Sequence, residues 1–96
     1  MATIDVSEKA DWKLFEDLAW VLEQGLGGRW KEKLDGLDQR YWDLLVDKHT
    51  VTLHLEHYLG ISVIIPDDAD DLARRVCAAL NQPPLGLARS NRSHLI

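Results

Sequence analysis

The residues best suited to chemistry in this sequence lie on two neighbouring segments that are predicted to be strands. Tyr41 and Asp43 alternate on the first segment, and His54, Glu56 and Tyr58 alternate on the second. Because successive side chains of a strand point to opposite faces, these five residues are expected to share one face of a sheet. An imidazole beside a carboxylate can act as an acid or base, and tyrosines among acids also suit a binding surface.

The surrounding sequence matches no motif for metal binding or covalent catalysis. His54 and His57 fall on opposite faces of a strand, so they do not form a ligand pair. No serine or cysteine is placed to complete a nucleophilic set. We therefore expect no metal and no cofactor, and we favour a protein that is not an enzyme without excluding one. A cross-strand hydrogen-bond and charge pair on an exposed sheet face would also account for these residues.

The strands that carry the candidate residues are predicted within residues 40–66. This segment is apolar, β-branched and aromatic, with a turn-like Asp-Lys-His in its middle, so it predicts a hairpin followed by a third strand, Ile61 to Ile65. Pairing Val46 with either Val51 or His49 places the same apolar residues on one face, and both registers remain open. The continuous apolar run from Ile61 predicts a strand that is covered on both faces or lies at a well-packed sheet centre. The predicted buried face comprises Trp42, Leu44, Val46, Val51, Leu53 and Leu55.

Two amphipathic patterns flank these strands. The first predicts a helix over Glu8 to Gln24, capped by Ser7, and the second a helix over Asp68 to Leu80, capped by Asp67 or Asp68. Each helix has one apolar stripe that needs a sheet to cover it. On the second helix, Cys77 is expected to be a buried, inert thiol.

Trp12 and Trp20 lie two turns apart on the first helix, at the edges of its apolar stripe. Tryptophans in this position usually seal the rim of a core, and we favour that interpretation. The alternative is a pair of interface anchors, because tryptophan is enriched at binding hot spots.

The remaining segments complete an α+β domain. Ala2 to Val6 predicts a short strand, and Arg29 to Leu34 predicts an edge strand whose lysines discourage edge-to-edge pairing. The predicted order is β-α-β-β-β-β-α, an antiparallel sheet of three to five strands with two helices packed on one face. Residues 1–80 are expected to form this single domain, and residues 81–96 a flexible C-terminal tail.

Composition limits the classes of partner. The 96 residues carry a net charge of −5, and without Arg89 and Arg92 of the tail, residues 1–80 have 9 basic against 16 acidic side chains, a net −7. This balance argues against nucleic acid and favours a basic partner. The sequence contains no apolar run long enough to span a membrane, no signal-peptide pattern and a single cysteine, so a cytoplasmic location without membrane contact is expected.

One segment also carries a resemblance. Leu37 to Pro66 combines Tyr-Trp, Thr-Leu-His and Leu-Gly-Ile-Ser in the order found in a family of small uncharacterised proteobacterial proteins, which it resembles over about a third of the chain. The resemblance implies a fold and a bacterial source, since that family has no assigned activity. In size and charge alone the chain is also similar to bacterial immunity proteins, which neutralise basic toxin domains.

These observations lead to two expected functions. The first is a small acidic protein-binding module, with an immunity-type inhibitor as one form of it, that uses Tyr41, Asp43, His54, Glu56 and Tyr58. The alternative is a small enzyme or ligand-binding domain with its site on the Asp43/His54 face. Self-association into a homodimer through an exposed strand edge is also left open.

Overall fold

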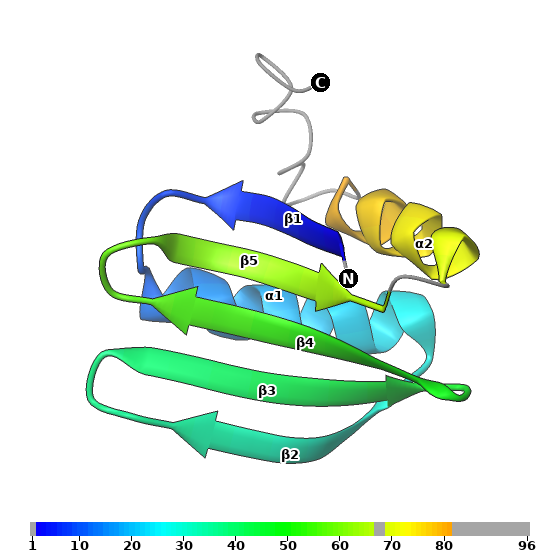
Figure 1. Cartoon of the computed structure of the whole chain (residues 1–96), viewed down its shortest axis with the longest axis horizontal. Helices are drawn as coiled ribbons and strands as arrows, with labels where there is room; N and C mark the ends of the chain where they lie inside the picture. The colour runs from blue at the N-terminus through cyan, green and yellow to red at the C-terminus, as the bar shows by residue number, and fades with distance from the viewer. Residues whose placement is uncertain (1, 67–68, 82–96) are drawn as a thin grey trace.

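A computed structural model of the chain describes residues 2–66 and 69–81. Within these residues the order is β1 (Ala2–Ser7), α1 (Trp12–Leu26), β2 (Arg29–Asp35), β3 (Gln39–Val46), β4 (His49–Glu56), β5 (Gly60–Ile65) and α2 (Asp70–Leu80). The strands form one sheet in the order β1-β5-β4-β3-β2, and every neighbouring pair is antiparallel. Figure 1 shows both helices on one side of this sheet. The predicted α+β fold and element order are confirmed.

The core lies between the sheet and the helices, as the alternating patterns require. Every second residue of β3 and β4 is buried, and the register pairs Val46 with His49, the second of the two registers that the sequence allows. The turn between them is short because Asp47 adopts a left-handed conformation with φ 56°. The fully buried side chains of the core are Phe15, Leu18, Leu22, Leu44, Val46, Val51, Leu53, Leu55, Ile61, Val63, Ile65 and Val76.

The first helix begins four residues later than predicted. Asp11 caps α1, since its carboxylate accepts hydrogen bonds from the backbone N–H groups of Lys13 and Leu14. The predicted cap, Ser7, instead ends β1, where its hydroxyl oxygen accepts a bond from the N–H of Lys9. Two good capping residues compete here, and Asp11 caps the helix because pairing with β5 keeps the chain extended as far as Ser7. The helix ends at the left-handed Gly27.

Three smaller predictions need correction or lie beyond the described residues. Cys77 is exposed, because the buried stripe of α2 passes through Leu72, Val76 and Leu80 on another side of the helix. The expected caps at residues 67–68 lie outside the described residues, and α2 begins after Ala69 without a side-chain cap. The tail predicted over residues 81–96 lies outside them too, except for its first residue.

The third predicted strand, β5, is covered on one face only. Ile61, Val63 and Ile65 point into the core, whereas Ser62 and Ile64 are partly exposed on the other face. The helices cover a single side of the sheet, so an apolar run through a central strand leaves part of its apolar surface in contact with solvent. No helix in the described part of the chain is long and apolar enough to cross a bilayer.

Candidate functional site

The face of the sheet turned away from both helices is called the open face here, and it carries four of the five predicted site residues. Tyr41 lies opposite His54 in the ladder between β3 and β4, and their rings stack with centroids 4.2 Å apart and planes 14° from parallel. Asp43 and Glu56 lie one step away along the same two strands. The alternation of the sequence therefore brings these residues to one surface, as predicted.

Asp43 and His54 share this face but are not hydrogen-bonded to each other. The register places Asp43 opposite Thr52, and the Thr52 hydroxyl donates to the Asp43 carboxylate at 2.7 Å. The cross-strand neighbour of His54 is the ring of Tyr41. A carboxylate that orients an imidazole must accept a hydrogen bond from its N–H. In this arrangement Asp43 and His54 therefore do not form the general acid–base pair considered from the sequence.

His54 is held in a state that favours its neutral form. Its Nε2 atom is buried and has no hydrogen-bond partner among the described residues. Burial lowers the pKa of His54 below its ordinary 6.5, and the nearby Glu56 carboxylate opposes this effect only in part. The neutral ring stacked on Tyr41 forms part of a flat aromatic surface, and its Nε2 atom lies beneath that surface without a hydrogen-bond partner among the described residues.

Tyr58, the fifth predicted residue, lies in the turn between β4 and β5 and not on the strand. Its side chain is 84% exposed, and its ring meets that of His57 edge to face at 4.7 Å. The chain leaves the sheet after Glu56, whose ladder partner is Gly60, so the alternation expected to continue to Tyr58 stops two residues earlier. Leu59 beside it is also largely exposed.

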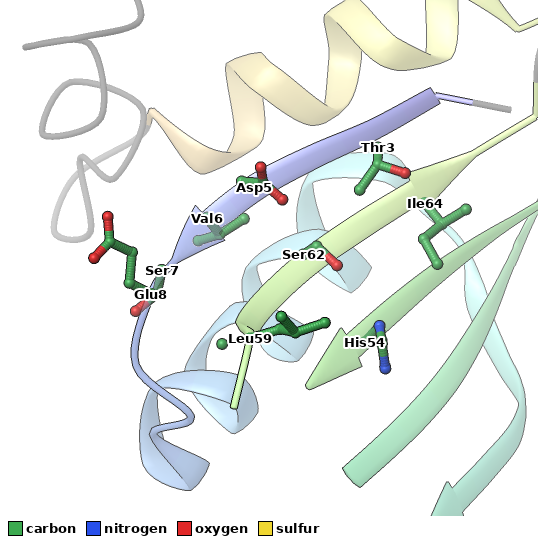
Figure 2. Close-up of a pocket in the computed structure, with 10 residues that line it drawn as sticks. Thr3, Asp5, Val6, Ser7, Glu8, His54, Leu59, Ser62 and Ile64 are labelled. Carbon is green, nitrogen blue, oxygen red and sulfur yellow. The ribbon is translucent and has the colours of Figure 1, made fainter. Parts of the chain in front are cut away.

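A hollow of about 700 Å³ adjoins His54 on the open face. Figure 2 shows Ser62 between the residues of β1 on one side and His54 of β4 on the other, with Leu59 at the turn. The lining mixes hydroxyl, carboxylate and apolar groups and comprises Thr3, Asp5, Val6, Ser7, Glu8, His54, Leu59, Gly60, Ser62 and Ile64. This composition suits a polar group or a cation that also contacts apolar surface.

Metal binding finds no support in the described part of the chain. Nowhere in residues 2–66 and 69–81 do three or more histidine, cysteine, aspartate or glutamate side chains gather in a group that could hold an ion. The open face has acids and one stacked imidazole, but they are spread along different strands.

Arg40, which no motif or sequence pattern singled out, organises the helix side of the sheet. Its side chain is only 6% exposed, and its guanidinium contacts the Asp35 carboxylate at 2.9 Å. It also lies against aromatic rings, 4.5 Å from the centroids of Trp12 and Trp42 and 4.8 Å from that of Phe15. The sequence feature that could have revealed this cluster is an arginine at a buried strand position next to Tyr-Trp. Such an arginine requires an acid and aromatic partners.

Asp35 completes this cluster. It accepts hydrogen bonds from Arg40 and from the indole N–H of Trp42, the latter at 2.8 Å. Hydrogen bonding by Arg40, followed by that of Trp42, lowers the pKa of Asp35 below its ordinary 3.8. Trp12 covers Arg40 at the rim of the core, and 40% of the surface of Trp12 is exposed. Trp20, also on α1, is 62% exposed. The two tryptophans do not play the same part.

Comparison with known proteins gives one match. The model of the family described as "Protein of unknown function (DUF3630)" matches residues 2–81, which include every described helix and strand. Neither the curated proteins nor the solved structures contain a match. The match spans most of the chain and both surfaces of the sheet, and the chain therefore belongs to the DUF3630 family of proteins of unknown function.

Proposed function

We propose that this protein is a small acidic binding module for a basic protein, and that it uses the open face of its sheet. The observation that carries the proposal is that the helices cover one face only, while the other presents an aromatic stack, Tyr41 on His54, bordered by the acids Asp43 and Glu56. An aromatic centre within a polar, charged rim is the usual composition of a protein-binding surface.

The charges of the molecule support a basic partner. The chain has a net charge of −5. On the open face, Glu32 of β2 pairs with Asp43, which places two acids side by side. The same strand also carries the bases Arg29, opposite Leu45, and Lys31, whose ammonium donates to the Thr50 hydroxyl at 2.8 Å. Adjacent like charges repel each other in the free protein, so a cationic partner gains affinity and association rate by neutralising them.

The proposal is tested by affinity capture from a cell lysate at low salt, with the wild-type chain and two charge-reversed variants in parallel. Asp43→Lys/Glu56→Lys reverses two acids on the open face. Asp17→Lys/Asp71→Lys makes the same change on the two helices, where the side chain of Asp71 is 78% exposed and that of Asp17 46% exposed. We expect a partner rich in lysine and arginine that is released by salt and is bound roughly tenfold more weakly by the open-face variant alone.

Two results would count against this function. The first is a partner retained in high salt, because charge attraction between exposed groups is screened. The second is equal weakening by both variants, which would show that total charge matters and the open face does not.

A second candidate function, a small enzyme or ligand-binding domain, is favoured by the hollow beside His54. Its lining of hydroxyls and carboxylates beside the His54 ring is suited to a small polar molecule. A screen of small polar compounds by amide chemical shifts distinguishes the two functions. Saturable shifts confined to His54, Leu59 and Ser62, unchanged in Asp43→Lys/Glu56→Lys, would favour the small ligand.

A further inference from the structure

Most of the large apolar side chains that the structure exposes gather at one end of the sheet. This turn end is formed by residues 8–11, 36–38 and 57–59, which connect β1 to α1, β2 to β3 and β4 to β5. Leu37 is fully exposed at 101%, Tyr58 at 84% and Leu59 at 72%. Three further exposed side chains lie next to these connections: Trp12 is 40% exposed, Leu34 56% and Tyr41 38%. Among the large apolar residues recorded as exposed in the described chain, Trp20 alone lies elsewhere.

The three connections form one continuous surface. The N–H of His57 donates to the carbonyl of Asp38 at 2.9 Å, which joins the second connection to the third. Gly60, directly after the third, packs so closely on Ser7 and Glu8 that a Cβ on this glycine would overlap their backbone. Leu59 also shares the wall of the hollow with Ser7 and Glu8. The exposed side chains thus border a common patch.

The fold does not require apolar side chains at these positions. Short connections between strands favour glycine, proline, asparagine, aspartate and serine, because these residues form turns readily and are suited to solvent-exposed positions. Leu37 has its full surface in solvent, so it contributes nothing to the core. Isolated exposed leucines are ordinary, but apolar side chains on adjoining loops make a contiguous patch, and such patches mark interaction sites.

The charges at this end indicate what covers the patch. The carboxylate of Asp35 is already paired with the buried Arg40. Otherwise the connections and the strand ends beside them carry the acids Glu8, Asp11, Asp38 and Glu56 against the base Lys9. Two copies of the chain that met through this end would bring these acids together at an apolar contact, which is electrostatically unfavourable. The complementary surface is apolar at its centre and cationic around it.

We propose that the turn end is the docking surface for a cationic amphipathic segment of a partner protein. In this arrangement the apolar side chains of the segment cover Leu37, Tyr58 and Leu59, and its lysines or arginines face Glu8, Asp38 and Glu56. This inference rests on the proposed binding function and deepens it, because it names the chemistry of the partner and extends the contact from the open face to the turn end that adjoins it at Glu56.

The test is an amide chemical-shift titration of the full chain with two synthetic peptides. The first is an amphipathic peptide of leucine and lysine, and the second has serine in place of leucine at the same charge. We expect the leucine–lysine peptide to shift the amides of residues 36–38 and 57–59 in a saturable manner. The serine–lysine peptide should bind at least about tenfold more weakly, since it lacks apolar area to bury on the patch.

Matched variants make the test specific. Leu37→Ser/Leu59→Ser removes two exposed side chains from the turn end, and Trp20→Ser removes a larger exposed side chain from α1. All three are surface positions, so an unchanged amide spectrum outside the substituted sites confirms the fold before the titration. The turn-end variant should lose affinity for the leucine–lysine peptide by at least about fivefold, and Trp20→Ser should retain it.

The outcomes separate this inference from the proposed function. Shifts centred on Asp43, Thr52 and Ile64 would keep the binding function on the open face and overturn the docking surface proposed here. Equal binding of both peptides would show attraction by charge alone and would overturn it as well. If neither peptide binds, the docking surface is overturned, whereas the binding function on the open face is decided separately by the affinity capture with Asp43→Lys/Glu56→Lys. A dimer in sedimentation that dissociates in Leu37→Ser/Leu59→Ser would show that a second copy covers the patch, which also overturns the inference.

Discussion

The two ends of the sheet are built from the same kinds of connection but differ in the side chains that they expose to solvent. At the turn end, Leu37, Tyr58 and Leu59 project into solvent. The opposite end is formed by residues 27–28, by the turn at residues 47–48 and by the start of α2. There, among the described residues, the connections carry glycine, aspartate, lysine, proline and alanine, and no large apolar side chain is recorded as exposed. The opposite end connects its elements without exposed large apolar side chains, so such side chains are not required for closing an end of this sheet.

Each end is also tied together by one arginine, in a different environment. Arg40 near the turn end is buried and lies among aromatic rings. Arg75 at the opposite end is 39% exposed, reaches Asp47 at 3.6 Å and donates to the carbonyl of Leu26 at 3.0 Å. The buried arginine fixes the shape of the end that we propose for binding, whereas the exposed one bridges three elements in contact with water.

The largest difference between the ends is expected for Gly60→Ala compared with Gly27→Ala. Both glycines have positive φ, 95° and 69°, so both alanines are strained. A Cβ at Gly60 would also overlap the backbone of Ser7 and Glu8, whereas a Cβ at Gly27 meets nothing within 4 Å. We expect Gly60→Ala to lower the free energy of unfolding by about 3 kcal/mol and Gly27→Ala by about 1 kcal/mol.

Urea denaturation of both variants measures these values. Equal losses would mean that the contact between the first and third connections is not tight, which would weaken the description of the turn end as one continuous surface.

A smaller effect is expected when the two arginines are truncated. Arg40→Ala removes a buried side chain from between Trp12, Phe15 and Trp42 and leaves Asp35 without its cation. We expect it to cost about 2 kcal/mol, reduced from the value for a fully buried pair because the Asp35 side chain is 48% exposed. Arg75→Ala should cost less than about 1 kcal/mol, because its partner Asp47 is 79% exposed.

Thermal unfolding of the two alanine variants compares them directly. Arg40→Met separates packing from charge, since it keeps most of the side-chain volume: if it is as unstable as Arg40→Ala, the ion pair with Asp35 dominates. A larger loss of stability for Arg75→Ala than for Arg40→Ala would contradict the conclusion that the buried Arg40 fixes the shape of the turn end.

The smallest effect concerns the pH dependence of stability through His54. The pKa of His54 in the folded protein lies below the 6.5 of the unfolded chain. At a pH between these two pKa values, the unfolded chain therefore binds a proton that the folded protein does not. The contribution of His54 to stability is therefore complete above pH 6.5 and is lost as the pH falls toward the pKa of the folded state. Denaturation at several values between about pH 7 and pH 5 should show this decline, and His54→Gln should make it shallower.

His49→Gln is the control, because it removes an imidazole from the opposite end of the same strand. A slope that changes equally in both variants would mean that the burial of His54 beside Tyr41 has no special effect. An amide and imidazole titration by NMR assigns the slope to a residue.

Much of the fold follows from the sequence because strands and helices have distinct periods. The alternation through Trp42, Leu44 and Val46 fixed which face of β3 is buried, whichever register was chosen. Local signals were less reliable where two candidates lay close together, as Ser7 and Asp11 did for the start of α1. The exposure of Cys77 was harder to predict, because it lies one turn from both Ala73 and Leu80, at the edge of the apolar stripe of α2.

The candidate site divides in the same way. Alternation alone was enough to place Tyr41, Asp43, His54 and Glu56 on one face, because it depends only on the period of a strand. Whether Asp43 faces His54 or Thr52 depends on the cross-strand register, which tertiary packing selects. The patch of Leu37, Tyr58 and Leu59 also needed the folded structure, since it arises only when connections distant in sequence meet at one end of the sheet. Sequence period thus determined the faces of this protein, and tertiary contacts decided which residues are neighbours on them.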